Sequence, residues 1–194
     1  MITDENVVLS GVVEMDEVYA GAPPRKPHGG GPSGVKSGRG PRRPLVLTMA
    51  ERGGPVVFQR IVSHSINAIQ SASHNRISAD AVVSTDALPA YRKAVAGRAH
   101  ITVKHSAGEF VRRDAGGAGI DAHTNTAEAV HAEIRRAVIG VWHWISQKHL
   151  DRYLDEISWR HNRREVGHLR RIAAVLFAAG RPLPVRALVN NGIV

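Results

Sequence analysis

The chain contains no cysteine among its 194 residues. This absence excludes disulfide bonds and every zinc site built on thiolate ligands, although it does not by itself assign a compartment. The sequence also has no run of about eighteen apolar residues, so it predicts no membrane-spanning helix. The first six residues are polar and acidic, and we expect no secretory signal peptide. A cytoplasmic protein is the default expectation.

Acidic residues are scarce relative to basic ones. The chain has 17 Asp and Glu residues against 26 Lys and Arg residues, a formal net charge of +9. Such an excess predicts a polyanionic partner. Nucleic acid fits better than an anionic membrane, because the basic residues fall in expected loops and helices without a lipid-inserting aromatic face.

The segment 21–44 contains no acidic residue at all and is rich in glycine and proline. Such a composition cannot bury a core, so we expect a mobile loop. Its cations are predicted to contact DNA phosphates, and they are Arg25, Lys26, Lys36, Arg39, Arg42 and Arg43.

Apolar periodicity and turn residues predict a sheet with helices packed on it. The expected strands cover residues 12–20, 45–50, 56–62, 80–86 and 100–104, with a hairpin turn at 51–54. The expected helices cover residues 65–77, 89–95, 124–141 and 146–165. Ser146 is the predicted N-cap of the last one. The mixed pattern indicates an α/β or α+β fold. We assign residues 1–166 to one core domain and 167–194 to a helical tail.

Two acids, Asp16 and Asp86, each follow an apolar strand-like run. A carboxylate in such a position is costly to bury unless it is paired or bound to a cation. If the two strands are neighbours, both carboxylates lie at one edge of the sheet and suit Mg²⁺. Two ions about 3.5–4 Å apart can activate a hydroxyl and stabilise a leaving oxygen in phosphodiester chemistry. The alternative is that both acids only cap strand-to-loop turns.

The helix expected at 124–141 has two different faces at 100° per residue. Asn125, Glu128 and Arg135 lie on the polar face, where an Asn or Glu oxygen could complete a metal shell and Arg135 could hold a phosphate. The alternative is a solvated face with a Glu–Arg pair. The opposite, apolar stripe consists of Val130, Ile134, Ala137, Val138 and Val141.

Five segments follow one another in the order VEMDEVYAG (13–21), STDALPAYR (84–92), HITVKHSAGEFV (100–111), HTNTAEAVHAEIRR (123–136) and VWHWISQKHLDRYLDEISWRHNRR (141–164). In order and spacing they resemble the catalytic core of bacterial insertion-sequence transposases of the ISXO-like branch, over roughly residues 11–164. The resemblance implies a ribonuclease-H-like fold and metal-dependent DNA cleavage and strand transfer with two Mg²⁺ or Mn²⁺ ions.

The resemblance also assigns roles to residues. Asp16 matches the first acid and Asp86 the second, and the third ligand is Asn125 or Glu128. Arg135 stands where the family usually has a Lys. The implied partners are the element's terminal repeats, target DNA and further copies of the chain in a synaptic complex, which places the protein at the nucleoid.

The second long helix adds a predicted DNA surface with Lys148, Arg163 and Arg164. Trp142, Trp144 and Trp159 are interpreted as packing residues rather than base-stacking platforms. His100, His105 and His123 are expected around the site as structural groups.

The sequence also departs from the resemblance at its beginning. Relatives commonly begin with a zinc-ribbon or helical DNA-binding segment, whereas this sequence begins close to the first catalytic strand and has no cysteine. A truncated copy or a core that relies on a partner is therefore one expectation. Two alternatives to a working transposase stay open, an inactive DNA-binding remnant and a nuclease of the same fold that cuts without joining.

Overall fold

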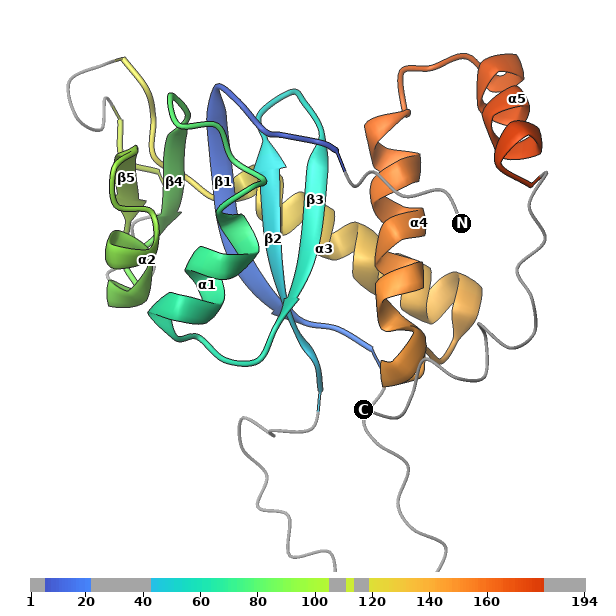
Figure 1. The fold of residues 1–194 in the computed structure, drawn as a ribbon, viewed down its shortest axis with the longest axis horizontal. Coiled ribbons are helices and arrows are strands. Elements are labelled where there is room, and N and C mark those ends of the chain that lie inside the picture. The colour runs from blue at the N-terminus through green and yellow to red at the C-terminus, as the bar shows by residue number, and fades with distance from the viewer. Residues whose placement is uncertain (1–5, 22–42, 105–110, 114–118, 180–194) are drawn as a thin grey trace, which may run out of the picture.

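A five-stranded mixed sheet forms the centre of the molecule (Figure 1). The computed structural model describes residues 6–21, 43–104, 111–113 and 119–179. The sheet has the order β3-β2-β1-β4-β5. Strands β1 and β2 and strands β2 and β3 pair antiparallel, whereas β4 runs parallel to both β1 and β5. The strands are β1 (Val12–Tyr19), β2 (Leu45–Glu51), β3 (Val56–Ile61), β4 (Val82–Asp86) and β5 (Ala99–Val103).

This topology confirms the predicted fold class, a mixed sheet flanked by helices in the strand order of a ribonuclease-H-like fold. Strand β1 lies at the middle of the sheet between an antiparallel and a parallel neighbour. Because β1 has a partner along each edge, its polar side chains can only point into one of the two layers that cover the sheet.

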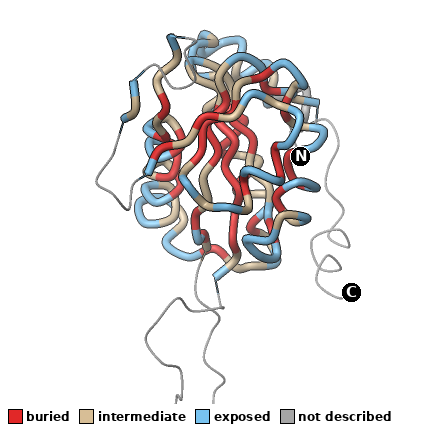
Figure 2. Tube along the Cα trace, turned by 90° about the vertical axis from the view of Figure 1, so that its left-hand side faces the viewer, coloured by how far each residue is buried: buried red, intermediate tan, exposed pale blue. Residues whose placement is uncertain are grey.

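Helices α1 (Ile66–Ser73) and α2 (Pro89–Ala94) cover one face of the sheet. Their side chains pack against residues such as Met15 and Val83 in the larger apolar cluster. Ser65 caps α1, since its side chain accepts a hydrogen bond from the backbone N–H of Ala68 at 3.3 Å. The strands and the inner sides of these helices are the buried parts of the trace in Figure 2.

Helices α3 (Asn125–Ala137) and α4 (Leu150–Asn162) belong to the second layer. Ile134 of α3 and Leu154 of α4 pack with Val18 and Val46 of the sheet. The helix α5 (His168–Ala179) follows α4 and lies beyond it in Figure 1. No helix in the described ranges is both long and apolar enough to cross a bilayer.

The helix predicted at 124–141 is shorter than expected. Its α-helical part ends at Ala137, and the chain continues as a π-helical turn over Val138–Trp142. The wider turn changes the angle per residue, so an apolar stripe drawn at 100° per residue still holds at Val138, which packs against the core, but fails within the turn. Val141, predicted in that stripe, is 61% exposed, and this assignment was wrong.

The helix predicted at 146–165 also begins differently. Gln147–His149 form a 3₁₀ turn, and α4 starts at Leu150. Ser146 is the N-cap residue of this 3₁₀ turn and has the extended backbone of that position, but its side chain makes no capping hydrogen bond, and the N-cap of α4 itself is His149. The 3₁₀ turn satisfies backbone groups locally, which removes the need for a side-chain cap at that point.

The carboxyl end of α4 is joined to the edge strand β3 by the side chain of Asn162. Its Oδ1 accepts from the backbone N–H of Val56 at 2.7 Å, and its Nδ2 donates to the carbonyl of the same residue at 3.0 Å. An edge strand otherwise exposes unpaired backbone groups. The Asn162 amide therefore satisfies both backbone groups of Val56 at the outer edge of β3, where α4 ends.

We expect Asn162→Ala to lower the free energy of unfolding by about 1–3 kcal/mol, because two backbone groups of Val56 lose their partner. Urea unfolding followed by circular dichroism measures the change. Asn67→Ala, an exposed position on α1, is the matched control. Equal effects of the two substitutions would contradict a specific role for the Asn162 amide.

Candidate active site

A buried carboxylate, Glu14, lies under the first turn of α3 and is fully shielded from solvent. It accepts hydrogen bonds from the Nε of Arg52 at 2.7 Å and from the backbone N–H groups of Thr126 and Ala127 at 2.7 and 3.1 Å. The Thr126 hydroxyl donates to it at 3.0 Å, and the Nδ1 atom of His123 lies 3.0 Å away. Glu14 thus satisfies orphan donors at the helix start.

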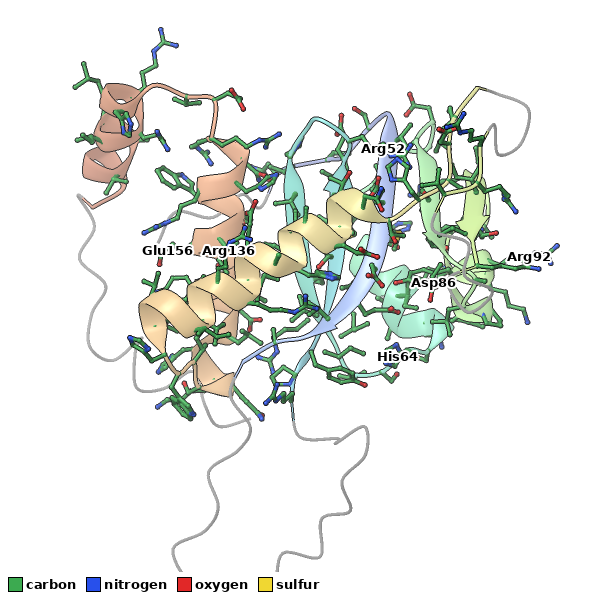
Figure 3. All side chains as sticks on the ribbon, turned by 180° about the vertical axis from the view of Figure 1, so that it is seen from behind. Arg52, His64, Asp86, Arg92, Arg136 and Glu156 are labelled. Atoms are coloured by element: carbon green, nitrogen blue, oxygen red, sulfur yellow. The ribbon has the colours of Figure 1, made fainter. Side chains whose placement is uncertain are left out.

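The Glu14 interaction joins parts of the chain that are far apart in sequence. Arg52 sits in the turn between β2 and β3, and it also donates to the carbonyl of His123 at 3.3 Å. The hydroxyl of Ser84 on β4 donates to that same carbonyl at 2.8 Å. Figure 3 shows α3 crossing this face of the sheet diagonally, with Arg52 near its beginning. A negative charge is favourable at a helix amino end.

Sequence reasoning missed Glu14. The available signal was its spacing, because Glu14, Asp16 and Val18 alternate along one strand and must point to the same face. A strand with an acid at two successive positions of one face indicates that this face meets donors or a cation.

Asp16 and Asp86 lie at matching heights in the sheet. The parallel ladder between β1 and β4 ends with Met15 beside Thr85, and the two acids are the next residues along each strand. Asp16 lies within β1, which continues to Tyr19 through its pairing with β2, close to the predicted strand limit at residue 20. The carboxylates sit at the end of the β1–β4 ladder, where the two strands diverge.

The carboxyl group of Asp16 lies in a strongly acidic environment. Burial raises its pKa to about 7, against a backbone hydrogen bond from Glu17 that lowers it. The negative charges of Glu17, Asp86 and Glu128 are smaller contributions to the same rise. The site therefore gathers carboxylates from β1, β4 and α3 without a compensating cation on Asp16.

Asp86 has a partial structural role. Its Oδ1 accepts a hydrogen bond from the backbone N–H of Leu88 at 3.0 Å, the geometry of an Asp that caps a strand-to-loop turn. The turn brings α2 back beneath the sheet, and Figure 3 shows Asp86 on the β4 side of the site. Capping and metal binding are compatible, because a carboxylate has two oxygens.

Asn125 and Glu128 occupy successive positions on one side of the first turns of α3, and both are exposed. Glu128 lies close enough to Asp16 to raise its pKa. The Thr124 hydroxyl lies 3.5 Å from a carboxylate oxygen of Glu128. Both candidates for the third ligand are thus open to solvent, and the charge of Glu128 acts on Asp16.

A buried histidine, His131, separates Asp16 from the apolar core. Its Nε2 is 2.9 Å from the hydroxyl of Thr48 on β2, and its Nδ1 is 3.7 Å from Oδ2 of Asp16. Burial, with a smaller contribution from the charge of Arg135, lowers its pKa to about 4. The ring is therefore neutral near pH 7 and does not neutralise the carboxylate form of Asp16. Sequence reasoning assigned His131 no role at the site.

Glu17 points to the opposite face from Asp16, since strand side chains alternate. His64 lies 3.3 Å from it, and the Tyr19 hydroxyl is 3.3 Å from the other His64 nitrogen. Burial raises the pKa of Glu17, against Tyr91 and His64, which lower it. Burial and the nearby acids raise the pKa of Tyr91 well above its ordinary value, although its hydroxyl makes no hydrogen bond of standard geometry to a described residue.

The histidines expected around the site take structural positions where they are described. His123 contacts Glu14, and the Nε2 of His100 is 2.9 Å from the hydroxyl of Thr85. His105 lies outside the described residues.

The predicted DNA-contacting residues divide into three groups. Arg43 and Arg135, 92 positions apart, line one cavity beside the end of β1. Lys148 precedes α4, whereas Arg163 and Arg164 follow it, so the two ends are separated by about 20 Å. Residues Arg25, Lys26, Lys36, Arg39 and Arg42 lie outside the described residues.

The two arginines after α4 have structural contacts. The Arg163 guanidinium lies 5.1 Å from the ring centre of Trp159, and Arg164 donates to the carbonyls of Gly54 and His161. Two residues of the predicted DNA surface, Arg163 and Arg164, thus also make contacts within the chain.

A divalent cation such as Mg²⁺ requires several oxygen ligands close together. Within the described residues, no three His, Asp or Glu side chains form a preformed metal cage. The chemistry of the site nevertheless fits a hard cation, because Asp16 is desolvated among other carboxylates, and the described part of the chain offers it no partner at contact distance that is positively charged at neutral pH. Asp16, Asp86 and an oxygen from Asn125 or Glu128 are the atoms that could hold it.

A mixed sheet in this strand order, with acids from β1 and β4 at one end of their ladder and a polar helix face across them, defines the ribonuclease-H-like class of enzymes that act on nucleic-acid phosphodiesters. The family model described as the ISXO2-like transposase domain matches residues 8–162, and the chain belongs to this family of DDE transposases. No curated protein and no solved structure gave a significant match. Membership implies a transposase that binds DNA, in a family whose members generally use a divalent metal.

We expect Glu14→Ala to lower the free energy of unfolding by about 3–5 kcal/mol, because it leaves the Arg52 charge and the first N–H groups of α3 without their acceptor. Thermal or urea unfolding measures this change. The control is Glu156→Ala, which removes an exposed carboxylate paired with Arg160 on α4 and should cost less than about 0.5 kcal/mol. A loss at Glu14 no larger than at Glu156 would refute the anchoring role.

Proposed function

We propose that the chain catalyses metal-dependent cleavage and strand transfer of the DNA ends of an insertion sequence. The observation that carries the proposal is the placement of Asp16 and Asp86 at one end of the β1–β4 ladder, where burial, together with the neighbouring carboxylates, raises the pKa of Asp16 to about 7. A buried carboxylate among other carboxylates is stabilised either by a proton, as the raised pKa reflects, or by a bound cation.

The proposed ligands are Asp16, Asp86 and either Asn125 or Glu128, with Mg²⁺ or Mn²⁺ as the cation and two ions in the working site. When bound, such ions lower the pKa of an attacking hydroxyl and stabilise the leaving oxygen of a phosphodiester. The effect of Glu128 on the pKa of Asp16 favours Glu128 as the third ligand, although Asn125 lies one turn earlier on the same side of α3.

The remaining residues act on geometry and charge. Glu14 holds the beginning of α3 against β1, which keeps the third ligand opposite the two aspartates. His131 stays neutral and fills the space behind Asp16. Arg135 extends from the same helix and is proposed to bind a DNA phosphate, in company with the basic segment 21–44, which includes Arg43.

We further propose that residues 1–166 form the catalytic unit and residues 167–194 a helical tail. Lys148, Arg163 and Arg164 would add phosphate contacts at the two ends of α4. The working form is proposed to be a homo-oligomeric synaptic complex on the terminal repeats and target DNA. The rival functions are a DNA-binding remnant without catalysis and a nuclease that cuts without joining, and the following two experiments separate them.

Mg²⁺ should stabilise the chain against unfolding by occupying the acidic cluster. At 100 times the dissociation constant the gain is about 2.7 kcal/mol, and each kcal/mol raises the melting temperature of a chain of this size by about 2–4 °C. Asp16→Asn should instead raise the melting temperature without divalent ions, because it removes a desolvated charge, and should abolish most of the Mg²⁺ effect. Differential scanning calorimetry measures both, with Glu156→Ala as control. A Mg²⁺ shift that survives in Asp16→Asn would place the ion elsewhere.

A labelled duplex that carries the element's terminal repeat, incubated with Mg²⁺ or Mn²⁺ and target DNA, should yield cleaved and joined products. Asp86→Ala should reduce both products by at least a thousandfold, while Glu156→Ala should not change them. Between Glu128→Ala and Asn125→Ala, the larger loss identifies the third ligand, and we expect it at Glu128. Cleavage without joining would indicate the nuclease, and binding without either product the remnant.

A further inference from the structure

A cavity of about 310 Å³ lies where β1 leaves the sheet, beside the end of α3. Its volume is at the lower end of the range for small-molecule pockets. Apolar walls come from Val18, Ile134 and Val138. The aromatic and charged lining residues come from three separate parts of the chain, namely Tyr19, Arg43, Arg135, His143 and Trp144.

Trp144 differs from the other two tryptophans. Trp159 is buried, and Trp142 packs against Tyr153 with ring centres 4.7 Å apart. Trp144 is 42% exposed and lines the cavity, so its interpretation as a packing residue was wrong. The packing of Trp142 and Trp159 was predicted correctly.

The backbone around Trp144 is unusual. A π-helical turn over Val138–Trp142 precedes it, and His143 has a φ of 56°, in the left-handed region that non-glycine residues rarely adopt. Such π turns and strained residues are enriched at functional sites, where the surrounding structure holds them. Here they turn Trp144 toward the cavity instead of continuing the helix.

Both β1 and α3 lead from the acidic cluster around Asp16 to the cavity. Val18 is two residues beyond Asp16 on the same face of β1, which corresponds to about 6.6 Å. Arg135 lies one turn beyond His131, which contacts Asp16. A stacked DNA strand advances about 3.4 Å per nucleotide, so the cavity is within about two nucleotides of a phosphate held at Asp16.

We propose that this cavity holds one unstacked nucleobase of the DNA strand whose phosphodiester is cut. Trp144 stacks on the base, and Arg43 and Arg135 bind the phosphates on either side of it. Aromatic rings are sequence-tolerant platforms for bases, and arginine forks match phosphate oxygens. The inference rests on the proposed function in that the strand is the DNA substrate.

The test compares two single strands with the same phosphates, a fluorescein-labelled thymidine pentamer and a pentamer of abasic deoxyribose phosphates. Binding is measured by fluorescence anisotropy in the absence of divalent ions. Wild-type protein should prefer the thymidine strand by about 5- to 150-fold, the range expected when one base stacks on an aromatic ring. Trp144→Ala should lower this preference to near unity, and Trp144→Phe should restore most of it.

Two further variants separate stacking from charge and from folding. Arg135→Ala should weaken both strands by the same factor, because it removes a phosphate contact. Val141→Ala, an exposed position three residues earlier that does not line the cavity, should change neither. Circular dichroism verifies that each variant is folded. A base preference that persists in folded Trp144→Ala, or that Val141→Ala removes equally, overturns the proposal.

A third arm distinguishes a strand from a free nucleotide. Thymidine monophosphate at concentrations where the unlabelled pentamer displaces the probe should leave the probe bound, and full displacement by the monophosphate would overturn the assignment to a DNA strand. Because these measurements need no catalysis, the outcome is independent of strand transfer. A Trp144-dependent preference without any cleavage product would support the cavity and reject the proposed function.

Discussion

The buried Glu14 carboxylate is the constraint on which the site depends. A charge without solvent is tolerated only when donors surround it, and here the donors are Arg52 from the β2–β3 turn and the first N–H groups of α3. The position of α3 on the sheet is therefore not adjustable. Since strand side chains repeat every second residue, the same anchor sets Asp16 opposite the following turns of the helix, where Glu128 and His131 lie.

Around that anchor the molecule keeps an arrangement that is unfavourable without a ligand. Asp16 lies among carboxylates, its nearest basic neighbour is a histidine held neutral by burial, and its proton affinity rises accordingly. A structure selected for stability alone would place an apolar residue or a paired charge there. The destabilising effect of this cluster is consistent with a binding site for a divalent cation. The hydrogen-bonded network of Glu14, two residues earlier on β1, offsets it by stabilising the fold. Glu14 thus contributes to stability, whereas Asp16, the next residue on the same face of β1, belongs to the proposed active site.

The sequence predicted the elements more accurately than their ends. Short apolar runs bounded by turn residues located all five strands, because strands that are covered on both faces are apolar along their length. The errors fell in the helices, where the sequence of one segment carries no information about the residues that pack against it. The π-helical turn after Ala137 shifts the helical phase, so Val141 and Trp144 became exposed against expectation, and the 3₁₀ turn at Gln147–His149 lies between Ser146, the expected N-cap, and the start of α4.

By itself the sequence determined the fold class, the resemblance to a transposase family and the acids that stand at the ends of apolar runs, since these depend on residue types and on short periodic patterns. Only the tertiary structure decided which of those residues meet. It set Asp16 beside Asp86 through the β1–β4 ladder, joined Glu14 to α3, and brought Arg43 and Arg135 to one cavity with Trp144. The physical reason is that register and helix phase are set by long-range pairing and packing, and neither is encoded in a local window of the chain.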